Sequence, residues 1–270
     1  MVSTLWLLVA CRQTLTSDVS TPRPGRLWND TLPQILADNG QVKYEELQTH
    51  REALEGFVHW LAEPKRPQKH LKKADRHAFW INAFNALLLF QIVERDLTSV
   101  DEVEGWLPLE DSGFYVETDF WVDGQRISLA EIRDERLRLR KYDPRDHAAL
   151  IDGSPTSPPL RAALYHENSL DQALTEAMRR VINDPRTGVD VLDGVALFPP
   201  IFQAFPTDFL RFTTADSLCA YAVEFADPPL REPLEALART GCPVKFRSRE
   251  RSLNRARHGL PFSPVPNRPE

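Results

Sequence analysis

Residues 78–90 of this 270-residue chain read Ala-Phe-Trp-Ile-Asn-Ala-Phe-Asn-Ala-Leu-Leu-Leu-Phe and form its most apolar stretch. Asp75 lies just before this stretch and can cap a helix, so we predict a helix over about residues 76–94. A helix that is hydrophobic nearly all round is buried. The flanking charges and two internal asparagines, Asn82 and Asn85, argue against a membrane span. We therefore expect the fold to be organised around this helix.

The segments on either side are predicted to be mainly helical. Residues 44–62 carry apolar side chains at helical spacing, which indicates an amphipathic helix. Asp-Gly pairs suit tight turns and predict two hairpins, at residues 114–127 and 190–198. Further helices are predicted at about 128–140, 159–166, 169–182, 199–212, 214–226 and 232–240, with a short strand at 244–246. The expected fold class is α+β, a mainly helical single domain with a small antiparallel sheet.

We expect one globular domain over residues 31–257, with a polar tether at 12–30 and a proline-rich tail at 258–270. Residues 1–11 end in Leu8-Val9-Ala10-Cys11, which resembles the bacterial lipobox, in which the cysteine is lipidated. A signal peptide normally opens with Lys or Arg, and none precedes Cys11. We predict an exported protein of the periplasm or cell envelope, anchored to a membrane by a lipid on Cys11. A cytoplasmic location is the alternative.

The charge balance and the cysteines exclude several classes of protein. The 33 basic and 39 acidic side chains leave a net charge of −6, which argues against a nucleic-acid partner. Cys11, Cys219 and Cys242 are interpreted as isolated residues, because they are too few for a disulfide scaffold and lack the spacing of metal ligands. The histidines form no zinc pattern and the glycines no phosphate loop. No metal and no cofactor are therefore predicted.

Several blocks of the chain resemble one known family. Residues 79–87, Phe-Trp-Ile-Asn-Ala-Phe-Asn-Ala-Leu, are similar to the signature (F/Y)-W-I-N-A-Y-N-A-L of the family catalogued as domain of unknown function 547. Four more blocks follow in the family's order: residues 122–132 resemble G-x-x-x-S-L-x-x-I-E, residues 143–150 D-P-R-x-H-F-A-L, residues 207–209 a late D-F block and residues 252–254 the closing S-L-N. The resemblance covers roughly residues 44–255. Members are often exported bacterial proteins or lipoproteins, which agrees with the prediction for Cys11.

The chain departs from the family where that motif has cysteines. After its histidine the motif continues N-C-A-S-x-x-C-P, whereas residues 151–158 read Ile-Asp-Gly-Ser-Pro-Thr-Ser-Pro. Asp152 stands at the first cysteine position and Ser157 at the second. A carboxylate cannot replace a thiolate as an acyl-transfer nucleophile, and a serine can do so only beside a base and an oxyanion hole. If the family acts through these thiols, this member has lost that chemistry.

The blocks also supply the candidate site residues. The candidate catalytic residues are His147, Asp152 and Ser157. The candidate binding residues are Asn82, Asn85, Arg145 and Ser154. For the two asparagines the alternative is a purely structural hydrogen-bond network that braces the loop at 143–158.

Three hypotheses for function follow from these residues. The first is an exported, membrane-tethered domain that binds an unknown ligand or protein partner and has no acyl-transfer activity. The second is a hydrolase or acyl transferase that uses Ser157 or Ser154 with His147 as the base. The third is a structural envelope protein without a small-molecule site. Convergence of the candidate residues in one cleft favours a site, whereas dispersal favours a scaffold.

Overall fold

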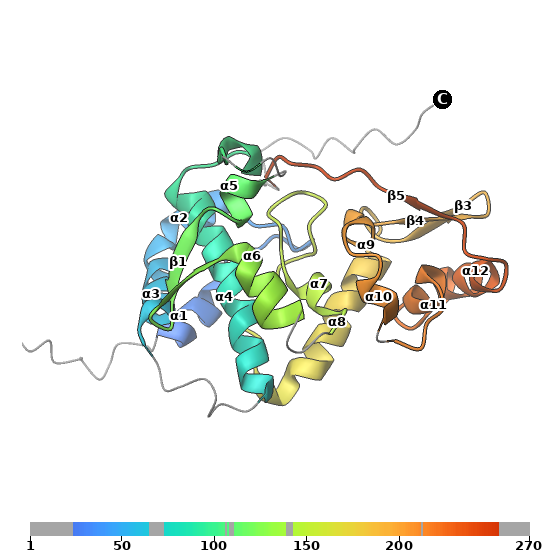
Figure 1. Ribbon diagram of the computed structural model, residues 1–270, viewed down its shortest axis with the longest axis horizontal. Helices are drawn as coiled ribbons and strands as arrows, with labels where there is room; N and C mark the ends of the chain where they lie inside the picture. The colour runs from blue at the N-terminus through green and yellow to red at the C-terminus, as the bar shows by residue number, and fades with distance from the viewer. Residues whose placement is uncertain are drawn as a thin grey trace, which may run out of the picture.

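The computed structural model describes residues 24–64, 73–105, 107, 111–138, 143–211 and 213–253. Over these ranges the protein is a mainly helical α+β domain with two small sheets, which confirms the predicted fold class (Figure 1). The α-helices are α1 (Pro24–Thr31), α2 (Tyr44–Thr49), α3 (Arg51–Ala62), α4 (Lys73–Glu94), α5 (Ser112–Tyr115), α6 (Leu129–Glu131), α7 (Asp146–Ala149), α8 (Leu170–Asn183), α9 (Pro200–Ala204), α10 (Asp208–Arg211), α11 (Leu218–Val223) and α12 (Pro228–Arg239). The other helical turns are η2 (Val100–Glu102), η3 (Ile132–Arg138) and η4 (Glu167–Ser169).

The two predicted hairpins are present, in separate sheets. β1 (Asp119–Val122) pairs with β2 (Gln125–Ser128), and β3 (Asp190–Leu192) pairs with β4 (Val195–Phe198), both antiparallel. Both Asp-Gly turns have positive φ at each residue, as the tight hairpin turn requires. β5 (Val244–Phe246) adds to β4 in parallel, a pairing that the sequence did not indicate. The first hairpin begins at Asp119 rather than at residue 114, because residues 112–115 form α5.

Helix α4 lies at the centre of the domain (Figure 1). Its residues from Ile81 to Leu89 are almost all buried, as expected for a helix that is apolar nearly all round. α3 packs against α4, and α1 packs against α3. Of the helices that the structure describes, none is both long enough and apolar enough to cross a membrane.

Residues 24–30, which the sequence placed in the polar tether, belong to α1 (Pro24–Thr31) and contribute to the core. Trp28 is buried, as are Leu32 and Ile35 beyond it. These side chains recur every three or four residues and so face the interior together. The folded part of the chain therefore begins earlier than predicted, because a few apolar positions outweigh the polar residues around them. Cys11, the rest of the tether and the proline-rich tail lie outside the described residues.

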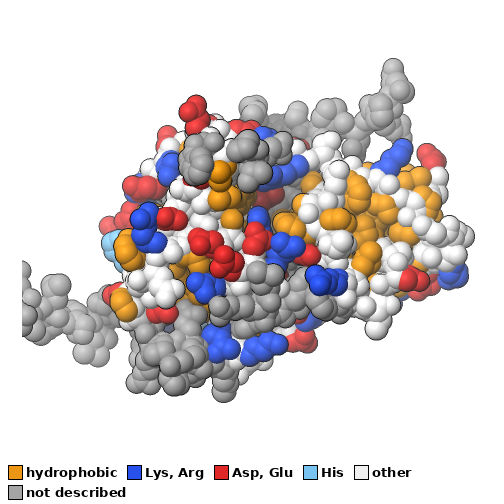
Figure 2. Space-filling view, viewed as in Figure 1, with side chains coloured by type: hydrophobic (Ala, Val, Ile, Leu, Met, Phe, Trp, Pro, Cys, Tyr) orange, Lys and Arg blue, Asp and Glu red, His pale blue; other side chains and the backbone are white. Residues whose placement is uncertain are grey.

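The C-terminal half has its own hydrophobic cluster, formed by α8 to α12 and the second sheet. Apolar side chains also gather on the surface of this part of the molecule (Figure 2). Cys219 of α11 and Cys242 beyond α12 form a disulfide whose Cα atoms are 5.8 Å apart. The interpretation of these two cysteines as isolated residues is therefore wrong. Their separation of 23 residues carries no signal of pairing, because the pairing depends on how α11 packs against α12.

Two predicted helices are also corrected. Residues 159–166 form a loop, because backbone groups there bond to side chains instead of to one another. Asn82 both donates to the carbonyl and accepts from the N–H of Tyr165, each at 2.9 Å, and Asn29 accepts from the N–H of Leu164. The helix predicted at 128–140 is α6 followed by the π-helix η3. Residues 139–142 lie outside the described ranges.

Candidate functional site

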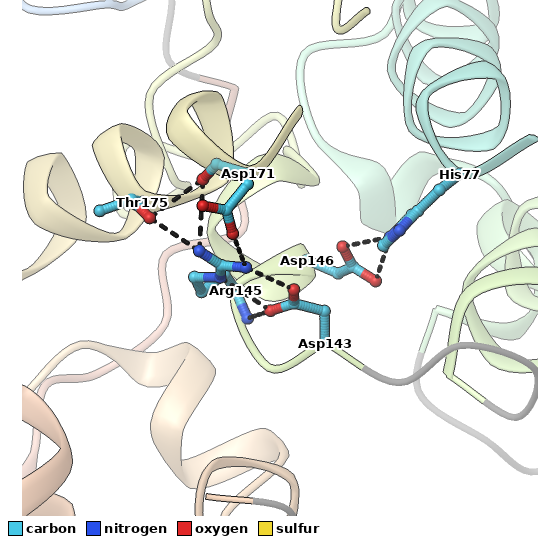
Figure 3. Close-up of polar contacts among 6 residues, drawn as sticks. All are labelled: His77, Asp143, Arg145, Asp146, Asp171 and Thr175. Carbon is cyan, nitrogen blue, oxygen red and sulfur yellow. Dashed lines mark hydrogen bonds and ion pairs between the residues drawn. The ribbon is translucent and has the colours of Figure 1, made fainter. Parts of the chain in front are cut away.

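Helix α7 is the structural centre of the candidate site, and all four of its residues are buried. Asp146 faces α4, where its carboxylate oxygens lie 2.7 and 2.8 Å from Nε2 of His77 (Figure 3). Burial raises the pKa of Asp146, although the hydrogen bond from His77 acts in the opposite direction. His147, the next residue, bonds instead to Asp208 of α10. Two histidine–aspartate pairs therefore fix α7 from two sides.

Arg145 holds the turn that leads into α7. Its guanidinium binds both carboxylate oxygens of Asp143, at 2.8 and 3.0 Å (Figure 3). It also reaches the first turns of α8, with 2.8 Å to Asp171 and 2.7 Å to Oγ1 of Thr175. Burial acts to raise the pKa of Asp143, but the hydrogen bonds from Arg145 prevail and lower it. Because its donors are engaged in this way, Arg145 acts as a brace between two segments.

His147 is oriented by a chain of charged side chains. Its Nε2 lies 2.8 Å from Oδ2 of Asp208. Arg138 donates to the same carboxylate, from Nε to Oδ2 at 2.6 Å and from Nη2 to Oδ1 at 3.0 Å. Burial acts to raise the pKa of Asp208, but hydrogen bonds from His147 and Arg138 hold it well below its ordinary value. Asp208 is therefore an ionised acceptor. In the neutral tautomer that donates from Nε2 to Asp208, Nδ1 is a hydrogen-bond acceptor.

The π-helix η3 explains how two arginines reach this site. In a π-helix the backbone hydrogen bonds join residues five positions apart, so Arg133 and Arg138 lie nearly above one another. Their guanidinium carbons lie 5.4 and 5.1 Å from the ring centre of Phe205. The ring of His147 stacks on Phe205 as well, with the centres 4.2 Å apart. His147 and both arginines therefore contact the same aromatic ring, that of Phe205.

A cleft of about 390 Å³ opens beside His147. This volume lies within the range of small-molecule sites. Apolar side chains form much of the wall, among them Phe84, Leu150, Ile201 and Phe205. Polar side chains also line it: Asp111, Tyr115, Arg133, His147, Asp152 and Arg249. Burial raises the pKa of Tyr115, so its hydroxyl stays protonated. The cleft thus combines an apolar wall with a few polar groups, as binding sites do.

The serines predicted as nucleophiles are engaged within their own loop. The hydroxyl of Ser157 donates to the carbonyl of Pro158 at 3.0 Å and accepts from the N–H of Asp152 at 2.9 Å. The hydroxyl of Ser154 lies 3.1 Å from that of Thr156. Within the described residues, neither serine lines the cleft or bonds to His147. Asp152 does line the cleft, but the partner of His147 is Asp208, so the structure does not assemble the predicted triad.

The two asparagines of α4 brace loops through paired hydrogen bonds. Asn85 donates to the carbonyl of Ala149 at 2.8 Å and accepts from the N–H of Ile151 at 3.1 Å. Asn82 holds Tyr165 in the same manner and lies beside a separate aromatic groove of about 750 Å³. Neither asparagine lines the His147 cleft. The geometry agrees with the structural alternative, although a binding role for Asn82, Asn85 or Arg145 stays a prediction.

Several residues of the cleft, and of the chain of charged side chains that orients His147, were not predicted from the sequence. Of these residues, Asp208 had the clearest signal in the sequence, because it lies in the block that resembles the family's late D-F pair. Arg133 and Arg138 belong to a charged helix without a motif, and their role depends on the π-helical geometry. Tyr115 and Arg249 come from distant segments. No spacing in the sequence relates either of them to His147.

These features define a helical α+β domain with a histidine–aspartate–arginine chain at the edge of a cleft of about 390 Å³. Residues 68–182 match the profile of the family described as "Protein of unknown function, DUF547". No curated protein and no solved structure gives a significant match. The matched region contains His147, Asp152 and both serines, whereas Asp208 and Arg249 lie beyond it. Among the described residues, no group of three or more His, Cys, Asp or Glu side chains is placed to hold a metal ion.

Proposed function

We propose that this protein is an exported binding domain that takes a small ligand in the cleft beside His147 and has no acyl-transfer activity of its own. One observation carries the proposal: the cleft places Asp152, the substitute for the first motif cysteine, in the wall that it shares with His147. Oδ2 of Asp152 lies 3.6 Å from Nε of Arg249, and its Oδ1 accepts from the N–H of Ser154. A carboxylate held in this way supports binding rather than nucleophilic attack.

Two measurements on the purified protein test the proposal. Binding is measured by thermal shift and calorimetry against a library of small metabolites, and we expect at least one compound whose affinity falls in Phe205→Ala. Hydrolysis is measured against a panel of esters and amides, and we expect none. Activity that is abolished by Ser157→Ala would contradict the proposal and favour the serine hydrolase.

A second candidate function is general-base hydrolysis with water as the nucleophile. It is favoured by the His147–Asp208 pair, because an aspartate that orients a histidine is the usual support for a general base. The same panel separates this candidate. Hydrolysis that persists in both Ser154→Ala and Ser157→Ala but is lost in His147→Asn would support general-base catalysis and contradict the binding function.

We further propose that the protein is exported and held at a membrane by a lipid on Cys11, in the periplasm or cell envelope. The disulfide between Cys219 and Cys242 supports export, because such bonds persist in oxidising compartments and are rare in the cytosol. The lipobox-like sequence before Cys11 supports the anchor. Mass spectrometry of the native protein tests both. An unmodified Cys11 in the soluble fraction would remove the anchor, and free thiols at Cys219 and Cys242 would favour the cytoplasm.

A further inference from the structure

The hydrogen-bonding capacity left unused in the cleft indicates the class of ligand. Arg133 lines the cleft and uses Nε and Nη2 to bind Asp134, at 3.0 and 2.7 Å. Among the residues that the structure describes, its Nη1 has no hydrogen-bond partner. The guanidinium also lies 5.9 Å from the ring centre of Tyr115, another residue of the cleft wall. One charged donor of Arg133 therefore remains for a ligand.

Arg249 supplies a second donor from a different segment. Its Nη1 binds Asp111 at 2.7 Å, and its Nε lies 3.6 Å from Asp152. Its Nη2 bonds to no described residue. Asp111 and Asp152 are the two carboxylates of the cleft wall, and both face Arg249. The carboxylates of the cleft are thus neutralised within the protein, whereas each arginine has one nitrogen that bonds to none of the residues that the structure describes.

His147 adds one acceptor to these two donors. Its Nε2 is committed to Asp208, and Nδ1 has no partner within the described part of the chain. Nδ1 can therefore accept a hydrogen bond from a ligand hydroxyl or from a water molecule that the ligand holds. Buried polar groups favour ligands that pair with them, because a group left unpaired loses its hydration without compensation. The remaining wall is apolar, with Phe84, Leu150 and Ile201 among its members.

We infer that the ligand of the His147 cleft carries an anionic oxygen group, a carboxylate or a phosphate monoester, on a mainly apolar body. Arg133 and Arg249 bind the anionic group, His147 accepts from a neighbouring hydroxyl, and the apolar body packs near Phe205. This inference rests on the proposed binding function and names its ligand class. An amine is disfavoured, because Asp111 and Asp152 are already paired with Arg249.

The test uses a library of matched compounds in which each aromatic or branched aliphatic body is present as a carboxylate, a phosphate monoester, a primary amide and an amine. Affinities are measured by calorimetry on the full chain at low and moderate salt. We expect the best anion to bind at least tenfold more tightly than its amide, and added salt to weaken only the anions. Amides or amines that bind as tightly at the cleft would overturn the ligand class and leave the proposed function standing. Binding by no compound of any class would count against both.

Variants locate the anion. Arg133→Met is expected to weaken the best anion at least tenfold and to leave its amide unchanged, while Arg133→Lys retains part of the preference. Arg26→Met is the matched control, because Arg26 is exposed on α1 and does not line this cleft. Circular dichroism and the unfolding midpoint show whether each variant is folded. Anion binding that is equal in Arg133→Met and Arg26→Met, with both folded, would overturn the assignment of Arg133.

Discussion

Replacing Asn85 by leucine tests whether this side chain holds the wall of the cleft. Asn85 is buried and bonds to the backbone of Ala149 and of Ile151, on either side of a cleft residue, Leu150. Leucine has the same number of side-chain heavy atoms but makes neither bond, so one carbonyl and one N–H lose their partner. Each unsatisfied buried group costs about 1–3 kcal/mol, and the two together give a loss of about 2–6 kcal/mol in the free energy of unfolding. For a chain of this size, that loss lowers the Tm by roughly 5–20 °C.

The assay is equilibrium unfolding in urea, followed by circular dichroism. Asn168→Leu is the matched control, because Asn168 is exposed and no hydrogen bond of its side chain is found among the described residues; its effect should stay within about 0.5 kcal/mol. Asn85→Asp adds a directional test. The aspartate keeps an acceptor for Ile151 but sets an anionic oxygen against the carbonyl of Ala149. This variant should therefore regain stability as the pH falls and the carboxyl becomes a donor. A loss under about 1 kcal/mol in Asn85→Leu would refute the bracing argument.

Three further predictions concern stability. Joint replacement of Cys219 and Cys242 by serine opens a loop with a sequence separation of 23 residues; the chain-entropy account gives a loss of about 3 kcal/mol, measured by urea unfolding, and an unchanged midpoint would contradict it. Asp208 has a folded-state pKa below its unfolded value of about 3.9. Its contribution to the free energy of unfolding is therefore present above that pH and is lost as the pH falls toward the folded-state pKa. Acid unfolding of Asp208→Asn should accordingly be less steep below about pH 4 than that of the native chain, and equal slopes would argue against this linkage. Gly153 has a φ of +80°, and an added Cβ would lie 3.1 Å from Cδ1 of Ile92; Gly153→Ala should cost about 1–2 kcal/mol, and a Tm equal to the native value would show that the loop absorbs the change.

Much of the fold could be predicted because its signals are local. The apolar stretch at 78–90 predicted the buried helix α4, and the Asp-Gly pairs predicted both hairpins. Ser99 and Ser128 each form a capping box with the glutamate three residues later, which is another local pattern. The helix predicted at 159–166 is wrong. The side chains that bond to the backbone of this loop come from α1 and α4, and the local sequence does not show them.

The sequence by itself determined the helical character of the domain, the buried position of α4, the resemblance to the family and the absence of both motif cysteines. These properties depend on neighbouring residues, whose spacing along the chain is also their spacing in a helix or turn. Only the tertiary structure decided that His147 pairs with Asp208 instead of Asp152, that both serines are engaged in their loop, and that Cys219 bonds to Cys242. The His147–Asp208 pair and the disulfide each join separate elements of the fold, whereas the serine contacts lie within one loop whose shape the sequence did not predict. The geometry of the two pairings is set by how helices pack over long distances in the sequence, and no local pattern records that packing.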